Sequence, residues 1–288
     1  MAAGEVVWLA LSDSGGAYAE AAEAARREIQ RSGATVEMQP WQQLLAAERT
    51  PPQLVIAIGG SAYTGLVESD LRAPLLATLL PRVVFERHAE RAARQGRAAS
   101  AVYLDQPPSR LLDLLRLALP ERRRIGVIFG PESRQWAPSL RSAIAERGMV
   151  LTSAETAAGR SLFPALQDLI DDSDLLLALP DPYVFNSLTV QNILTATYRR
   201  RIPLIGYSPA YIKAGALLAI YSTPAQVGAQ AGEIARAVLA GRPLPAVQAP
   251  REFSIGFNAD VARSLGIAVG ADAPEKWAEQ LRLKERAP

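Results

Sequence analysis

The stretch of sequence that decides the fold class runs from residue 119 to residue 133 and reads LPERRRIGVIFGPES. Leu119 and Pro120 end a leucine-rich helical segment, and the charged residues after them are typical of an exposed turn. The run from Ile125 to Phe129 has the length of a buried strand, and residues 130–133 predict a turn into a helix. A strand that is apolar on both faces and precedes a helix is typical of a parallel sheet covered by helices.

The same order of strand, turn and helix recurs along the 288 residues of the chain. Runs of strand length occupy residues 6–11, 35–38, 54–58, 75–78, 101–104, 125–129, 175–179, 204–207, 216–221 and 253–257. Helix-forming residues fill the segments 17–31, 109–119 and 225–240. These strands are too many for one simple sheet, so we predict an α/β protein with two Rossmann-like, doubly wound lobes.

Composition and charge exclude several classes of protein. Hydrophobic residues make up 49% of the chain and charged residues 21%, as in a folded globular protein. The net charge is only +2, which argues against a nucleic-acid partner. The triplets Arg122-Arg123-Arg124 and Arg199-Arg200-Arg201 each precede a strand and are typical of solvated turns. The absence of cysteine excludes disulfides, thiolate catalysis and cysteine-ligated metals.

The start of the chain shows no targeting or DNA-binding segment. The apolar run from Val6 to Leu11 is too short to cross a membrane, and it lacks the basic flank and the cleavage site of a signal peptide. No helix-turn-helix segment precedes Val6, which disfavours a repressor.

Several segments resemble the ABC transporter substrate-binding proteins of the tryptophan-binding-like group, which have the type I periplasmic binding protein fold. The most specific segment runs from Leu104-Asp105-Gln106-Pro107-Pro108 through the helix at 109–119 to residues 124–133, and it is similar to the family's crossover between lobes. Residues 175–187, 201–208 and 213–221 are similar to the strands of its second lobe, and residues 225–243 to the helix that follows. The similarity covers nearly all of residues 5 to 267.

The resemblance implies two lobes joined by about three crossings and a hinge, with hinge closure as the working motion. Because the strand order restarts after the break at Pro120, we expect the division near residue 122. The first ligand-binding lobe is then residues 1–122 with about 223–243, and the second is residues 123–222 with about 244–288.

A ligand in an open α/β sheet lies beyond the carboxyl ends of the strands, where helix N-termini present free N–H groups. This rule selects the loops after the strands of both lobes, and we expect their side chains to line a cleft between the lobes. The expected ligand-binding residues are Ser12, Ser14, Ser61, Tyr63, Asp105 and Gln106 in the first lobe, and Ser133, Asp181, Tyr183, Phe185, Asn186 and Tyr207 in the second.

The loop PDPYVFN at residues 180–186 is the strongest candidate, because two prolines stiffen it and its two aromatic residues suit an apolar ligand. Tyr183 and Phe185 would equally well pack inward at the start of a helix. The same two interpretations apply to Tyr63, Tyr207 and Tyr211. Gly59-Gly60-Ser61 lacks the lysine of a phosphate-binding loop, and a tight strand-to-helix turn explains it.

Few charged residues lie in these loops, among them Asp13, Asp105, Asp181 and Arg134. A buried free amino acid needs counter-charges for its carboxylate and its ammonium group. We therefore predict a largely apolar or aromatic ligand, a class that includes lipid-like molecules. Asn186, Gln106 and the serines would fix its polar end.

No constellation in the sequence indicates catalysis. His88 is the only histidine, lies in a polar helical segment and has no partner carboxylate at a suitable spacing. Asp171-Asp172-Ser173-Asp174 precedes a buried strand and is typical of its entry turn. Asp105 and Asp181 would suit acid–base chemistry only if they faced each other across a closed cleft. We expect no enzyme activity, no catalytic residue, no metal and no cofactor.

The function predicted from the sequence is capture of a small-molecule ligand between two lobes and its delivery to the subunits of a membrane transporter. We expect a monomer in the periplasm that binds no nucleic acid, with the signal peptide absent from this sequence. The alternative is the ligand-sensing module of a signalling system, which would share the fold. A sugar- or lipid-modifying enzyme on the same fold would need a nucleophile, a base and an orienting group together.

Overall fold

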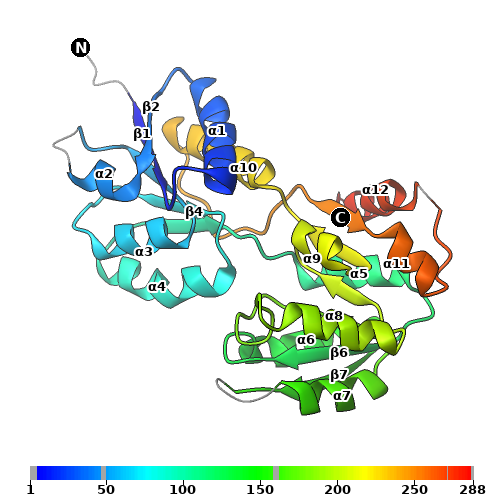
Figure 1. Ribbon diagram of the computed structural model, residues 1–288. Coiled ribbons are helices and arrows are strands. Elements are labelled where there is room, and N and C mark those ends of the chain that lie inside the picture. Colours follow the sequence, from blue (N-terminus) through cyan, green and yellow to red (C-terminus); the bar gives the residue numbers. More distant parts are fainter. Residues whose placement is uncertain (1–4, 47–49, 158–161, 271, 287–288) are drawn as a thin grey trace. The chain divides into compact units, whose positions relative to one another are not determined.

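The computed structural model describes residues 5–46, 50–157, 162–270 and 272–286. Within them the chain forms two α/β units, each with its own sheet (Figure 1). The first unit comprises Met1–Gln106 and Ser222–Phe253, and the second comprises Pro107–Tyr221 and Ser254–Pro288. The predicted fold class, with two mainly parallel sheets, is confirmed.

The first sheet has five parallel strands in the order β2-β1-β3-β4-β5. Its strands are β1 (Val6–Leu11), β2 (Thr35–Pro40), β3 (Leu54–Ile58), β4 (Leu75–Thr78) and β5 (Ala99–Val102). Its helices are α1 (Gly16–Gln30), α2 (Trp41–Ala46), α3 (Gly60–Glu68), α4 (Arg82–Arg94) and α10 (Pro224–Leu239). Strands β3 and β4 are buried throughout, because helices cover both faces of the sheet.

Helices α1 and α10 lie side by side on one face of the first sheet, although most of the chain separates them in sequence (Figure 1). Small residues allow the contact. A Cβ atom on Gly228 would overlap the backbone of Ala21, and one on Gly232 would overlap the backbone of Ala25. Helices α2, α3 and α4 contribute to the core on the other face. The returning segment thus completes the core of the first unit.

The second sheet has six strands in the order β11-β10-β9-β8-β6-β7, and only β11 is antiparallel to its neighbour. Its strands are β6 (Arg124–Phe129), β7 (Val150–Glu155), β8 (Leu175–Leu177), β9 (Leu204–Gly206), β10 (Leu218–Tyr221) and β11 (Ser254–Phe257). Its helices are α5 (Pro108–Ala118), the short 3-10 helix η1 (Arg134–Trp136), α6 (Ala137–Ala145), α7 (Phe163–Asp171), α8 (Val190–Arg199), α9 (Pro209–Ala214), α11 (Ala259–Ser264) and α12 (Ala273–Arg286).

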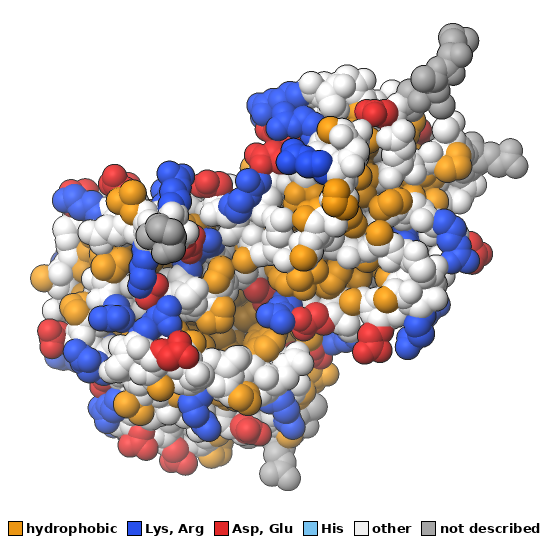
Figure 2. All heavy atoms as spheres, turned by 180° about the vertical axis from the view of Figure 1, so that it is seen from behind, with side chains coloured by type: hydrophobic (Ala, Val, Ile, Leu, Met, Phe, Trp, Pro, Cys, Tyr) orange, Lys and Arg blue, Asp and Glu red, His pale blue; other side chains and the backbone are white. Residues whose placement is uncertain are grey.

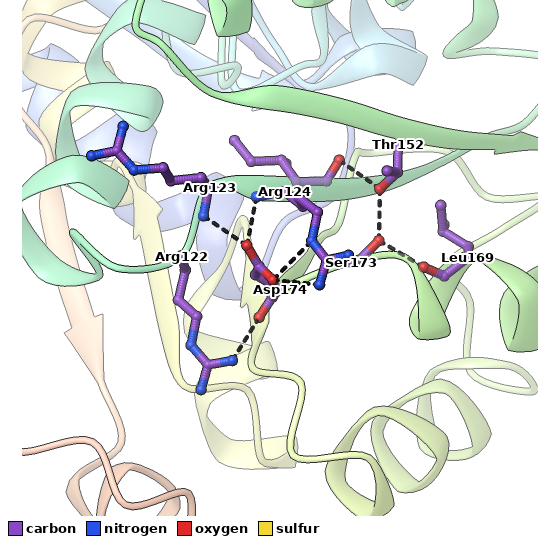
Figure 3. Close-up of polar contacts among 8 residues, drawn as sticks. Arg122, Arg123, Arg124, Thr152, Leu169, Ser173 and Asp174 are labelled. Carbon is purple, nitrogen blue, oxygen red and sulfur yellow. Dashed lines mark hydrogen bonds and ion pairs between the residues drawn. The ribbon is translucent and has the colours of Figure 1, made fainter.

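Asp174 joins the starts of two strands at the amino edge of the second sheet (Figure 3). Its Oδ2 accepts the backbone N–H groups of Arg123 and Arg124 at 2.9 and 2.8 Å, and its Oδ1 accepts the Arg124 guanidinium at 3.0 Å. Burial alone would raise the pKa of Asp174, but these hydrogen bonds outweigh it and hold the pKa below its usual value. The predicted entry turn before β8 is confirmed. The carboxylate of Asp174 in this turn stabilises the fold, because it binds the start of β6.

The boundary between the units differs from the expected position near residue 122. The sequence predicts α5 in the first lobe, but α5 packs against α6 and α12 of the second unit. Its buried Arg110 pairs with Glu285 of α12 at 2.6 Å, and its Asp113 pairs with Arg147 at 2.9 Å. These contacts explain why the second unit begins at Pro107.

The segment that returns to the first unit is also longer than the expected 223–243. Gln248 lies beside β5, where its N–H donates to the carbonyl of Ala101 and its carbonyl accepts the N–H of Tyr103. The segment therefore stays with the first unit as far as Phe253.

Candidate ligand-binding site

Three loops of the second unit lie next to one another at the carboxyl edge of its sheet, because β8 pairs with both β6 and β9. They carry Ser133, Asp181 and Tyr207, all predicted as ligand-binding residues. The Ser133 hydroxyl donates to Asp181 Oδ2 at 2.8 Å, which joins the first two loops. The charge of Asp181 also acts on the Tyr207 hydroxyl. The structure thus gathers these three positions in one place.

Asp181 is only 1% exposed, and its carboxylate organises two of these loops. Oδ2 accepts the backbone N–H groups of Glu132 and Ser133 at 3.0 and 2.8 Å, and Oδ1 accepts the N–H of Tyr183 at 3.0 Å. A Cβ atom on Gly130 would overlap this carboxylate. Because Asp181 is buried and several protein donors already bind its carboxylate, it is not exposed to form a direct ion pair with a ligand ammonium group.

The loop after β8 is held by its own side chains. Asn186 Oδ1 accepts the N–H groups of Leu188 and Thr189 at 2.9 and 3.2 Å, and its Nδ2 donates to the carbonyl of Pro182 at 2.8 Å. This amide was predicted to fix the polar end of the ligand, but the structure uses it to shape the loop.

The aromatic residues of this loop separate into one buried and one exposed side chain. Phe185 packs in the core of the second unit, so for this residue the inward interpretation holds and the structure corrects its placement on a ligand surface. Tyr183 is 47% exposed and Leu188 is 84% exposed, so both present apolar surface at the loop. Leu188 was not identified from the sequence, because a single leucine in a loop belongs to no pattern.

Tyr207, Tyr211 and Phe185 form an aromatic cluster beside this loop. The ring centroids of Tyr207 and Tyr211 are 4.7 Å apart, and those of Tyr211 and Phe185 are 6.2 Å apart. The Tyr211 hydroxyl donates to the Tyr207 hydroxyl at 3.0 Å. Burial raises the pKa of both hydroxyls, so both stay protonated near neutral pH. Tyr211 is buried, whereas Tyr207 is only partly buried.

At the carboxyl edge of the first sheet, Ser12 caps helix α3, since its Oγ accepts the N–H of Ala62 at 2.8 Å. Gly59 has a φ of 94°, and a side chain there would overlap Ser12 and Tyr18. The predicted strand-to-helix turn is therefore confirmed. Ser14 and Ser61 are both exposed.

Tyr63 does not lie at the loop surface that the sequence predicts for it. Its side chain is fully buried in the core of the first unit, where it stacks on Phe85 at 5.0 Å and lies edge-on to His88. Burial raises the pKa of its hydroxyl, which donates to the Phe85 carbonyl at 3.4 Å. The position lies one turn into α3, on the face that packs against the sheet.

Asp105 and Gln106 have structural partners at the end of β5. Asp105 Oδ2 accepts the N–H of Arg82 at the start of α4 at 2.6 Å; burial nevertheless raises the pKa of this carboxyl. Gln106 Nε2 donates to Ser222 Oγ at 2.9 Å, and Ser222 Oγ donates to the carbonyl of Glu252 at 2.6 Å. Gln106 therefore links the segments where the chain passes between units.

Neither a metal-binding cluster nor a membrane-spanning helix occurs among the described residues. No group of three or more histidine, aspartate or glutamate side chains among them is arranged to hold a metal ion. No helix in these parts of the chain combines the length and the apolar character needed to cross a membrane. On the face shown in Figure 2, basic and acidic side chains are mixed over the surface.

Comparison with known proteins gives a family match and several structural likenesses. Residues 32–272 match the family model described as ABC transporter substrate binding protein. No curated protein matches the sequence. A ligand-free, open structure of a substrate binding protein with adhesive properties from Clostridium difficile is similar, with a TM-score of 0.72 and 14% identity over 94% of this chain and 97% of the other.

Two further structures have a TM-score of 0.65. The ABC domain from Streptococcus pneumonia in complex with L-Trp is 14% identical over 96% of this chain and 99% of its own. A conserved domain protein from Vibrio cholerae is 18% identical over 94% of this chain and 97% of its own. At these identities the likeness shows a shared fold.

Proposed function

We propose, since the chain belongs to the family of ABC transporter substrate binding proteins, that it captures a small, largely apolar or aromatic ligand and delivers it to the subunits of a membrane transporter. Its fold is that of type I periplasmic binding proteins. The family binds substrates and is not enzymatic, in agreement with the expectation from the sequence.

The observation that carries the ligand class is the state of Asp181. It is a buried acidic group at the carboxyl edge of the second sheet, and hydrogen bonds within the loops already satisfy it. The carboxylate is therefore not exposed to form a direct ion pair, and an ammonium group buried without such a pair would cost several kcal/mol. The site therefore favours a ligand that brings no positive charge to this edge.

Exposed apolar side chains at the same edge of the sheet also support an apolar ligand. Tyr183 and Leu188 project from the loop after β8. A ligand that covers them gains about 25 cal/mol for each Å² of apolar surface removed from water. An aromatic or aliphatic ligand gains most from such a surface.

The structural likeness to a domain in complex with L-Trp is compatible with an aromatic ligand. That likeness concerns the fold. We propose that this chain accepts the aromatic part of such a molecule but not its zwitterionic end, because Asp181 is already occupied by protein donors.

We propose two groups of ligand-site residues. Ser14, Ser61, Tyr183 and Tyr207 have accessible side chains and contact the ligand directly. Ser12, Asp105, Gln106, Ser133, Asp181 and Asn186 shape the loops. The protein acts as a monomer in the periplasm.

Calorimetric titration at low salt tests the ligand class. The panel contains L-tryptophan and other amino acids, sugars, and neutral aromatic compounds such as indole and 3-phenylpropanamide. We expect the neutral aromatic compounds to bind most tightly. Leu188→Ser should weaken their binding about tenfold, because it removes a leucine side chain from the apolar surface.

Leu283→Ser is the matched control, since Leu283 is an exposed leucine of the second unit that lies on α12. It should leave the affinities unchanged. Tight binding of a sugar or a free amino acid, with no response to the neutral aromatic compounds, would refute the proposed ligand class. Native mass spectrometry of protein purified from its own host then identifies any bound molecule.

A further inference from the structure

The polar side chains at the carboxyl edge of the second sheet are not equally available to a ligand. Ser133 is fully buried; its Oγ accepts the N–H of Gly130 and donates to Asp181. Asp181 and Asn186 hold the loops through the contacts described above. These three residues have the chemistry of ligand-binding groups but are engaged within the protein.

Tyr207 differs from them because its hydroxyl accepts a hydrogen bond and still has its own proton to donate. The acceptor role is occupied by the Tyr211 hydroxyl at 3.0 Å. A hydroxyl group has one donor hydrogen and two acceptor lone pairs. Within the described residues, no acceptor receives the Tyr207 O–H group. Its proton must therefore point away from Tyr211.

The donor that sets this direction is held firmly. Tyr211 is buried, contacts the Phe185 ring edge-on, and packs so closely on Gly206 that a side chain there would overlap it. The oxygen of its hydroxyl group is thus held in place beside Tyr207. This arrangement orients the Tyr207 O–H group before any ligand arrives, which lowers the entropy cost of binding.

We infer, on the basis of the proposed function, that the Tyr207 hydroxyl donates a hydrogen bond to an uncharged acceptor atom of the ligand, with Tyr211 as its positioning residue. The acceptor is a carbonyl, ether or hydroxyl oxygen. An anionic group is disfavoured, because the negative charge of Asp181 acts on the Tyr207 hydroxyl and would repel an anion bound there. Burial is the main cause of the raised pKa of Tyr207; the hydrogen bond from Tyr211 lowers this pKa, and the charge of Asp181 raises it.

Three probes of related shape separate the contributions of the hydrogen bond, the ligand charge and the apolar surface in calorimetric titrations of the full chain. 3-Phenylpropanamide carries a neutral carbonyl acceptor, 3-phenylpropanoate carries an anionic one, and ethylbenzene has none. We expect the wild-type protein to bind the amide most tightly. Tyr207→Phe should weaken amide binding about tenfold and leave the affinity for ethylbenzene unchanged, because only the hydrogen bond is lost.

Tyr211→Phe tests the positioning role. It keeps the ring but removes the donated hydrogen bond, so the Tyr207 hydroxyl is free to rotate. We expect the preference for the amide over ethylbenzene to fall about threefold, a ratio that a general loss of packing would not change. Tyr198→Phe is the matched control, since Tyr198 is an exposed tyrosine on α8, and it should change neither affinity.

The outcomes distinguish this inference from the proposed function. If the wild type binds ethylbenzene and the amide but Tyr207→Phe leaves the amide affinity unchanged, the inference fails and the apolar site stands. Equal losses for both probes would assign Tyr207 a packing role, and tighter binding of the propanoate would refute the uncharged acceptor. If none of the three probes binds to the wild type, the proposed ligand class itself fails and the inference fails with it.

Discussion

Asp181 controls the shape of the candidate site without being free to bind a ligand. Its carboxylate accepts hydrogen bonds from the loop after β6 and from its own loop after β8, so each turn holds the other in place. Hydrogen bonds to an ionised group are stronger than those between neutral groups. The residue therefore acts through the conformation of the loops.

Asp181→Asn should lower the free energy of unfolding by about 2–3 kcal/mol, because one oxygen becomes an N–H donor that faces other donors. Urea unfolding followed by circular dichroism measures this change. Asp13→Asn is the matched control, because Asp13 accepts a hydrogen bond from the N–H of Gly15 at an exposed turn. It should change stability by less than about 0.5 kcal/mol. Equal stabilities of the two variants would contradict the role given to Asp181.

The lowered pKa of Asp174 predicts how the free energy of unfolding depends on pH. Its pKa lies below the usual value of 3.8 in the folded protein. The stabilisation that it supplies is therefore fully present above that usual value, and it is lost as the pH falls through the lower, folded value. Between about pH 6 and pH 3, the wild type should lose more unfolding free energy than Asp174→Asn.

Urea unfolding at a series of pH values measures this difference. Asp260→Asn serves as the control, because Asp260 forms only an exposed ion pair with Arg263 and should keep the wild-type slope. An Asp174→Asn variant whose stability falls as steeply as that of the wild type would show that the contacts of Asp174 do not carry the effect.

At the level of secondary-structure elements, close packing of α10 on α1 depends on Gly228. Alanine in the middle of a helix would normally stabilise it by about 1 kcal/mol relative to glycine. Here the added methyl group would overlap the carbonyl oxygen of Ala21, which belongs to the backbone and has little room to move. The two effects have opposite signs.

We expect Gly228→Ala to destabilise the protein by about 2–3 kcal/mol, because overpacking exceeds the gain in helix propensity. Thermal and urea unfolding measure the change. Ala229→Ser, at the next and only partly buried position of the same helix, should cost no more than about 0.5 kcal/mol. A Gly228→Ala variant that is more stable than the wild type would refute the close contact.

The elements themselves were predictable where they are buried. The apolar runs at 54–58 and 75–78 coincide with β3 and β4, which helices cover on both sides. Strand β7 (Val150–Glu155) was missed, because it lies at the edge of its sheet and has no fully buried residue, so its sequence shows no apolar run. Strand β5 begins two residues earlier than predicted, where small residues give a weak signal.

The candidate site was predictable in position but not in role. Ser12 and Asp181 come soon after the ends of strands. Their position at the carboxyl edge of a sheet therefore follows from the location of the strands alone. Whether a side chain meets a ligand or holds a loop depends on donors that are distant in sequence, such as the N–H of Glu132, 49 residues before Asp181. For Tyr63, a shift of one helical turn decides between surface and core.

At the level of the whole molecule, the chain passes between the two units after Gln106, after Tyr221 and after Phe253. Gln106, Ser222 and Glu252 lie at or beside these three points and are joined by hydrogen bonds through the Ser222 hydroxyl. The three connections are therefore tied together at their ends in the first unit.

Ser222→Ala should loosen these three connections together, because it leaves the amide of Gln106 and the carbonyl of Glu252 without this shared partner. We expect backbone amides near these residues to exchange with deuterium about tenfold faster, while those of β1 and β3 stay protected. Ser139→Ala, which removes a hydroxyl bonded to the Trp136 carbonyl on an exposed helix, is the control. Unchanged exchange at the connections would show that Ser222 does not join them.

Each unit is built from two separate stretches of the chain, so the ribosome makes the parts of one unit at different times. When the ribosome has added Tyr221, all five strands of the first sheet exist, but α10, which covers α1, has not been synthesised. The second sheet is likewise incomplete until β11 has been synthesised and pairs with β10. Both halves are therefore completed late and almost together, and a nascent chain that stalls before Phe253 exposes uncovered apolar surface that is prone to aggregation.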